Sequence, residues 1–528
     1  MSDVEKKGAS DGDTPSQGAP DIAQVGTAES IPPPGAEPSK GMEPDAQILD
    51  VAAEYLAANA SLYPPMTPEI ERKIVRKIDS WIIPILVFVA TLGAVDKVEI
   101  GTASLYGFQT DNHMHGQQYS WIGSILPLGQ LVGYFVTSYL IHWIPPARLL
   151  CIASLMWSCL TVLYAPCRSW SGFMALRFWM GFIEAAISPC LTMLVTNFYK
   201  KSEQPPRNAI IFAYFSSVFN GFFAWLIGLI PDSAPLHKWQ YLYLLTGTIN
   251  ILYSIFIFFV LPDTPMKARF LSPAEKFYAT QRLAGNRTGI ANRHWRWEQL
   301  WEALLDIKVW LIVVFNIVIN IPNGGLVSFG SIIIANLGFS ALNASLLTIP
   351  FGVLATSSAW VFSYWAARWT NRRTIVACVS LVLPIIGTAV LYGTPRTNMA
   401  AQMVGLYICY FYWPPYIIGI SLPQANTAGQ TKRAVTFSLV QVGYAAGNLI
   451  GPQTFRSNQA PKYTGAIIAM LVSYCACILL MLVYFGVAHW ENKKRDEKYG
   501  PPHEIHEGTT EGFVDITDKN QTDFRYTT

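Results

Sequence analysis

Charged residues are scarce in this sequence. Asp, Glu, Lys and Arg make up 13% of its 528 residues, whereas 52% of the residues are hydrophobic. An ordinary soluble domain carries about 25% charged residues. So little charge in so long a chain indicates that lipid is the solvent for most of it. A soluble enzyme, a disulfide-built secreted domain and a wholly disordered chain are therefore disfavoured.

Several motifs are also missing. The eight cysteines lie in or at the ends of apolar runs, and no pair of them has zinc-ligand spacing with histidine. No G-x-x-x-x-G-K-[ST] loop is present to cradle a nucleotide phosphate, which excludes an ATP-driven pump of the ABC type. The polar, acidic N-terminus has no signal-peptide pattern. We therefore expect no metal, no cofactor, no nucleic-acid partner and no enzymatic activity.

The first 66 residues differ from the rest. They hold eleven acids against three lysines, a balance of −8 within a chain of +3, so the other 462 residues carry +11. Rich in Pro, Gly and Ser, this segment is expected to be disordered. Residues 67–79 then repeat isoleucine every four positions among basic residues. That pattern fits a short basic helix on an anionic membrane surface or, equally, the solvated start of a longer helix.

Twelve apolar runs follow, each close to the ~20 residues that a membrane-spanning helix needs. They lie near 81–104, 119–141, 148–167, 171–195, 209–230, 240–261, 309–332, 342–367, 374–393, 399–422, 434–455 and 464–487. The longest loop separates six runs from six. We therefore predict an all-α membrane protein with twelve transmembrane helices in two six-helix, pseudo-symmetric bundles, the major facilitator layout.

Basic residues give the orientation. If both termini are cytoplasmic, the outside loops hold only five of the 37 Lys and Arg residues, as the positive-inside rule requires. The predicted organisation has five parts. It comprises a disordered acidic cytoplasmic tail (1–66), an N-terminal six-helix bundle (67–265), a basic cytoplasmic linker (266–307), a C-terminal six-helix bundle (308–490) and a cytoplasmic tail (491–528).

Ionisable residues inside the spans are few, and all lie in the first half: Asp96, Lys97 and Glu99 in the first span, Arg177 and Glu184 in the fourth. Such residues are expensive in a membrane and are functional candidates by default. Asp96 and Glu99 are three residues apart, and Arg177 and Glu184 are seven apart, so the members of each pair lie on the same face of their helix. Two interpretations stay open. These residues serve a proton-coupled anion carrier, or Arg177 forms a permanent ion pair between helices with Asp96 or Glu184.

Several motifs resemble one family. The segment RFWMGFIEA at 177–185 resembles the R-x-x-x-G-x-x-E-A signature of the anion:cation symporter branch of the major facilitator superfamily. DKVEIG at 96–101 is similar to that branch's D-[RK]-x-N-I-G, and LPDTP at 261–265 to its L-P-D-x-P. GQTKR at 429–433, GYAAGNLIGPQ at 443–453 and APKY at 460–463 resemble fungal allantoate permease-like transporters. The resemblance covers about residues 67–490.

The resemblance implies roles for the charged residues. Asp96 and Glu184 would couple protons, while Lys97 and Arg177 would meet a substrate anion. Lys97 replaces the commoner arginine, which keeps the charge but loses the two-pronged donor. Glu99 stands where many members have asparagine. This extra acid either contacts a cationic group of the substrate or pairs with Lys97.

The second half offers polar and aromatic groups instead of charge. The substrate-binding candidates there are Asn320, Tyr410, Gln441, Tyr444 and Asn448. Polar residues in spans often hydrogen-bond neighbouring helices, so a packing role is the alternative for each of them. The Pro414-Pro415 pair in the tenth span should break or bend its helix.

Taken together, these patterns predict a secondary active transporter that carries a small organic anion, such as a carboxylate or vitamin, in symport with protons by alternating access. Its partners would be the small-molecule substrate, protons and the lipid bilayer, and we expect a monomer in the plasma membrane. Two alternatives remain: export of a fungal secondary metabolite by the same fold, and nutrient sensing.

Overall fold

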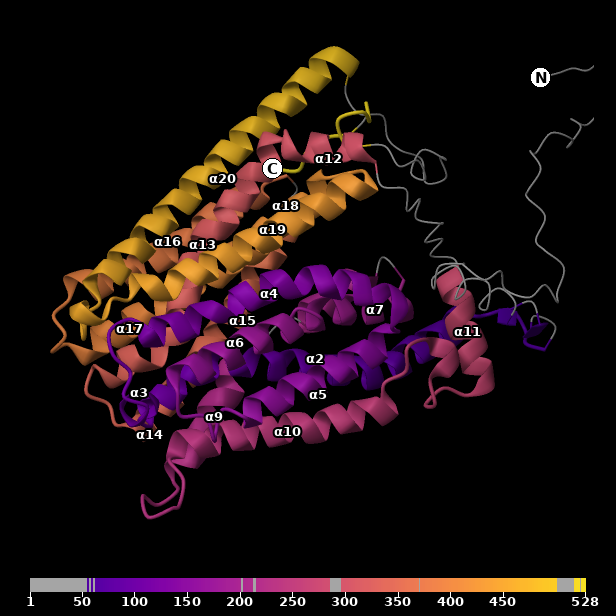
Figure 1. Ribbon diagram of the computed structural model, residues 1–528. Helices are drawn as coiled ribbons and strands as arrows, with labels where there is room; N and C mark the ends of the chain where they lie inside the picture. The colour runs from indigo at the N-terminus through magenta and orange to yellow at the C-terminus, as the bar shows by residue number, and fades with distance from the viewer. Residues whose placement is uncertain are drawn as a thin grey trace, which may run out of the picture. The chain divides into compact units, whose positions relative to one another are not determined.

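The computed structural model describes residues 55–56, 58–59, 62–200, 203–211, 215–284, 296–369, 371–500, 517–522 and 524–528 (Figure 1). Residues Tyr55–Thr528 form one compact unit. Most of the predicted disordered tail at 1–66 lies outside the described residues.

The regular elements of the described part are all helical. The first set comprises α2 (Pro68–Leu105), α3 (Phe108–Asp111), α4 (Gln118–Trp143), α5 (Pro146–Val162), α6 (Trp170–Glu184), α7 (Ile187–Phe198), α8 (Gln204–Ile211), α9 (Ser216–Gly228) and α10 (Lys238–Val260). The connecting segment contains η2 (Pro265–Lys267), α11 (Pro273–Ala284) and α12 (Trp297–Leu304). The second set comprises α13 (Ile307–Ala335), α14 (Ala341–Leu347), α15 (Ile349–Arg368), α16 (Arg373–Gly393), α17 (Met399–Cys409), η3 (Tyr410–Tyr412), α18 (Trp413–Asn426), α19 (Gln430–Ile450), η4 (Gly451–Thr454), η5 (Ser457–Gln459) and α20 (Thr464–Tyr499).

Ten helical stretches among the described residues are long and apolar enough to cross a membrane. The shorter apolar helices α5 and α9 occupy the places of the third and fifth predicted spans. The predicted all-helical membrane fold is thereby confirmed, and the count of twelve fits it.

Some helix boundaries differ from the predicted ones. The basic segment 67–79 is no separate surface helix, because α2 runs without interruption from Pro68 and buries Ile74 and Ile78. The fourth span is divided into α6 and α7. Pro189 explains this break, since it has no N–H to donate to the carbonyl four residues earlier. In the tenth span, η3 precedes Pro414 and Pro415, so the predicted break is present.

Close glycine contacts hold pairs of helices together within each set. Gly181 of α6 lies so near α4 that an added Cβ would be 2.1 Å from the Leu126 carbonyl oxygen. In the second set, a Cβ on Gly447 of α19 would be 2.3 Å from the Ile317 carbonyl oxygen of α13. Both glycines belong to the motifs quoted above. Their missing side chains therefore allow these backbones to approach each other, as small residues do between membrane helices.

Hydrogen bonds join the two sets at one end, which carries α3, α14 and α17 in Figure 1. Tyr119 donates to the Ser328 carbonyl at 2.6 Å, and Ser124 donates to the Leu449 carbonyl at 2.8 Å. Tyr106 lies 3.0 Å from the Ser345 hydroxyl. We call this the closed end, and the opposite end, from which α2 and α13 start, the linker end. Among the described residues, no hydrogen bond of this kind joins the two sets at the linker end.

The last residues of the chain pack against the second set at the linker end. The buried Lys432 Nζ lies 2.7 Å from Asp518, 3.0 Å from Asp306 and 2.9 Å from Glu302. The Tyr526 hydroxyl donates to Asp518 at 2.8 Å. Asp518, from the end of the chain, therefore completes a charge cluster with Lys432, Glu302 of α12 and Asp306, which precedes α13.

Candidate functional site

The predicted charged residues of the first half meet inside the first helix set. Asp96 and Glu99 are 1% and 0% exposed on α2, and Arg177 of α6 is 2% exposed. The Arg177 Nη1 donates to the backbone carbonyl of Asp96 at 3.1 Å. Its guanidinium lies 5.8 Å from the centroid of the Tyr164 ring. Among the described residues, Arg177 has no carboxylate oxygen within 4.0 Å, and the acid Glu184 pairs with Lys97 instead. The alternative of a permanent Arg177 ion pair is therefore not seen in this part of the chain.

Lys97 pairs with Glu184 instead of Glu99. The Lys97 Nζ lies 2.8 Å from the Glu184 carboxylate, and the two side chains are 29% and 9% exposed. Glu184 is the last residue of α6, just before the break between α6 and α7. This ion pair is therefore the more accessible part of the site, whereas Asp96, Glu99 and Arg177 lie behind it in the packed interior.

Neutral polar residues also contact the acids. Thr161 of α5 donates to Asp96 Oδ2 at 3.0 Å, and Thr246 of α10 donates to Glu99 Oε1 at 2.7 Å. Thr102, one turn beyond Glu99, donates to Asn220 of α9 at 3.2 Å. The sequence reasoning missed these residues, because a threonine or an asparagine within an apolar run carries no signal of which neighbour it faces.

Most candidates of the second half bond to one another. Asn323 Nδ2 lies 3.1 Å from Asn320 Oδ1 and 3.0 Å from Asn448 Oδ1, and Tyr412 donates to Asn323 at 2.6 Å. Asn320 in turn donates to Asn316 at 2.8 Å. This buried ladder links α13 to α19 and η3. For Asn320 and Asn448, such hydrogen bonds between helices are what the packing alternative expects.

The aromatic candidates differ in exposure. Tyr410 is 7% exposed and stacks on Phe351 with ring centroids 4.0 Å apart. Tyr444 is half-buried, and its ring centroid lies 6.0 Å from that of Tyr416. Gln441 is exposed. The structure therefore brings Asn320 and Asn448 together and leaves these three side chains in separate surroundings.

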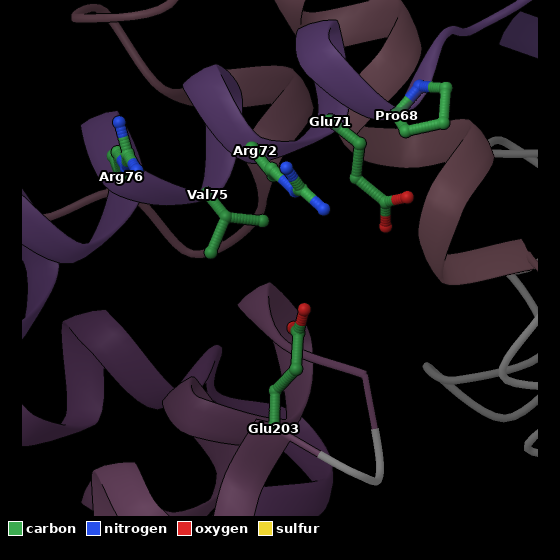
Figure 2. A pocket seen from close by; sticks show the side chains of 6 residues that line it. All are labelled: Pro68, Glu71, Arg72, Val75, Arg76 and Glu203. Carbon is green, nitrogen blue, oxygen red and sulfur yellow. The ribbon is translucent and has the colours of Figure 1, made fainter.

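A separate hollow of about 480 Å³ lies at the linker end of the first set, where Glu203 points across it toward the α2 turn that carries Glu71 and Arg72 (Figure 2). Its acids are already paired. Glu71 contacts Lys200 at 2.5 Å, and Glu203 contacts the buried Arg282 of α11 at 2.5 Å. The hollow contains none of the predicted site residues, and its ion pairs fasten α11 to the first set.

The chemistry open to this arrangement is binding and proton exchange. One accessible cation lies beside one carboxylate, and a buried arginine and two buried carboxyl groups lie behind them. Among the described residues, no group of three or more His, Cys, Asp or Glu side chains could hold a metal ion.

Comparison with known proteins gives consistent results. The family model described as Major Facilitator Superfamily matches residues 83–452. The chain is 38% identical over 482 residues to the MFS-type transporter cnsL of Penicillium expansum, covering 91% of this chain and 93% of that protein. It is 34% identical over 483 residues to the allantoate permease of Saccharomyces cerevisiae, covering 88% and 87%.

A solved structure supports the fold. The bacterial homologue of the human lysosomal transporter Spinster, in an inward-facing and unoccupied conformation, matches with a TM-score of 0.59. The match covers 80% of this chain and 97% of that one, at 14% sequence identity. At this identity the likeness concerns the arrangement of the helices alone.

Proposed function

Because this chain belongs to the Major Facilitator Superfamily and is a multi-pass membrane transporter rather than an enzyme, we propose that it carries a small organic anion in symport with protons. The similarity to an allantoate permease supports a carboxylate as the substrate. The observation that carries the proposal is the 2.8 Å ion pair between Lys97 and Glu184, the most accessible charges of the intramembrane site.

The ion pair suggests how the two fluxes are coupled. A substrate carboxylate that approaches Lys97 competes with Glu184 for the same ammonium group. Once displaced, the Glu184 carboxylate would remain charged in a medium of low dielectric, which is costly. It therefore takes up a proton, so anion and proton enter the site together. When the anion leaves, Lys97 recovers Glu184 and the proton is released.

The remaining site residues have proposed supporting roles. Asp96 is the second proton-coupling carboxyl group, and Arg177 supplies the second positive charge for the anion. Glu99 lies beside them as a further group of the site. From the second half, we assign Asn320, Tyr410, Gln441, Tyr444 and Asn448 as candidates for contact with the rest of the substrate.

The helix arrangement supports alternating access. Hydrogen bonds between the two sets at the closed end are consistent with a state that opens at the linker end. With the basic linker on the cytoplasmic side, that state faces the cytoplasm, as do both termini. We further propose two six-helix bundles at 67–265 and 308–490, a plasma-membrane location and a monomeric carrier.

Transport by the purified full-length chain in lipid vesicles tests the proposal. Radiolabelled allantoate should accumulate when the proton concentration outside is raised, and an internal pH dye should report proton entry on adding allantoate. Glu184→Gln should abolish this proton entry. Glu275→Gln, which alters an acid of α11 outside the spans, should retain it.

The outcomes separate the alternatives. Full proton flux in Glu184→Gln would overturn the site assignment. Accumulation of allantoate only in the reverse direction would favour export, and binding without any flux would favour a sensor.

A further inference from the structure

Asp96 and Glu99 are two buried carboxyl groups that neighbour each other on α2. They lie three residues apart on α2, and neither residue is more than 1% exposed. Residues three apart on a helix are neighbours on one face, so the two side chains lie next to each other. Two ionised carboxylates so close together in a low-dielectric interior repel strongly, so one of them normally keeps a proton.

The hydrogen bonds show where donors are missing. Thr161 donates to Asp96 Oδ2, and Thr246 donates to Glu99 Oε1. The other two oxygens, Asp96 Oδ1 and Glu99 Oε2, have no donor among the described residues. Arg177 does not fill this place, because its Nη1 donates to the Asp96 backbone and its Nε and Nη2 reach no acceptor among the described residues. A proton between these two oxygens would satisfy both of them, and unpaired buried polar atoms are costly.

The charge balance agrees. The five ionisable residues of the intramembrane site are two cations and three acids, namely Lys97, Arg177, Asp96, Glu99 and Glu184. Fully ionised, they carry a net charge of −1. One proton makes the site neutral, which removes the cost of an uncompensated charge in the membrane.

We propose that Asp96 and Glu99 hold one resident proton between Asp96 Oδ1 and Glu99 Oε2. Glu99 is then neither a partner of Lys97 nor a charged contact for the substrate, and the pair acts as a single −1 group. This inference rests on the proposed function, because it assigns the protonation state of that same site. The titratable groups that face the pair from the neighbouring elements are Arg177 and Glu184 of α6, Tyr164 after α5, and Tyr243 of α10.

The resident proton also explains why Glu184 is free to couple. With the pair at −1 and Arg177 at +1, the buried part of the site is balanced, and Lys97 and Glu184 form a second neutral unit. An arriving monovalent anion then requires one more proton, which Glu184 takes. The expected stoichiometry is therefore one proton for each monovalent anion, and Asp96 on this inference holds the resident proton instead of exchanging a second one.

Infrared spectroscopy of the full-length protein in lipid vesicles tests the shared proton without any substrate. A protonated carboxyl group absorbs at a C=O stretch separate from that of carboxylate, and the band shifts in D₂O. We expect this band in the wild type at neutral pH. It should be lost in Glu99→Gln, whose amide can donate to Asp96 Oδ1 and accept from Thr246. It should persist in Glu275→Gln, which alters an acid of α11 outside the site and leaves the charge of the site unchanged.

Each result decides the question. Absence of the band in the wild type, its survival in Glu99→Gln, or its loss in Glu275→Gln would overturn the shared proton. If Glu99→Gln is not folded, Glu99→Asp replaces it, and the band should then change frequency; an unchanged band would overturn the inference. The allantoate assay is independent of the infrared measurement. If the protonated carboxyl band does not behave as expected but transport is intact, the shared proton alone is refuted. If the band behaves as expected but transport fails, the proposed function alone is refuted.

Discussion

Gly181 should be intolerant of even a methyl group. An added Cβ would lie 2.1 Å from the Leu126 carbonyl oxygen and 2.9 Å from its carbonyl carbon, whereas ordinary contact begins at 3.4 Å. Gly181→Ala must therefore move α6 away from α4 by up to about 1.3 Å at this point, which is the difference between 3.4 Å and the 2.1 Å to the carbonyl oxygen. The obstacle is backbone, which cannot rotate away as a side chain can.

Two opposing effects set the size of the change. Overpacking in a well-packed interior costs about 1–3 kcal/mol. Replacing glycine by alanine gains about 0.4–1 kcal/mol, because the unfolded chain loses freedom. We therefore expect Gly181→Ala to destabilise the protein. Because Glu184 follows in the same helix, its 2.8 Å contact with Lys97 should also be disturbed and uptake should fall.

Thermal unfolding in detergent, followed by tryptophan fluorescence, measures the effect. The control is Gly486→Ala in α20, where an added Cβ meets nothing within 4 Å. This variant should unfold at the wild-type temperature or above it. If Gly181→Ala proves as stable as Gly486→Ala, the close approach of α4 and α6 is not what requires glycine, and the reasoning fails.

Two further predictions concern the charge cluster at the linker end. Lys432→Met leaves Asp306, Asp518 and Glu302 without their shared cation, and should lower the free energy of unfolding by about 3–5 kcal/mol; an unfolding midpoint equal to that of the wild type would contradict this. Burial alone would raise the pKa of Asp306, but the charges of Lys308 and Lys432 outweigh it and hold that pKa below its ordinary value. A lowered pKa contributes stability that is complete above the unfolded pKa of about 3.9 and is lost as the pH falls through the folded pKa. The advantage of the wild type over Asp306→Asn in unfolding should therefore shrink in acid, and a constant difference across pH would refute it.

The positions of the helices could be predicted from the sequence better than the contacts between their side chains. Runs of apolar residues mark spans because the bilayer sets their length, so α13 at Ile307–Ala335 lies within a few residues of the predicted 309–332. The breaks were less visible. The adjacent Pro414 and Pro415 predicted the break in the tenth span. The single Pro189 did not predict the break in the fourth span, because it lies within an otherwise apolar run.

The charged residues of the site were also visible, because charge inside a span is rare. Their pairing was not. Whether Lys97 meets Glu99 or Glu184 depends on the rotation of α2 about its axis and on its distance from α6. Spacing along one helix cannot supply such information. The same limit hid Thr161 and Thr246, which are defined as site residues only by the carboxyl groups that they face.

The closed end sets an energy scale for the conformational cycle. Six hydrogen bonds join the two helix sets there among the described residues, three of them to the backbone carbonyls of Ser328, Leu449 and Phe455. At about 0.5–1.5 kcal/mol each, they contribute about 3–9 kcal/mol. A substrate that binds with a dissociation constant between 1 mM and 1 μM releases about 4–8 kcal/mol. The seal is therefore firm against thermal opening, yet the free energy of substrate binding is of the same order, so the seal can be broken and remade in every turnover.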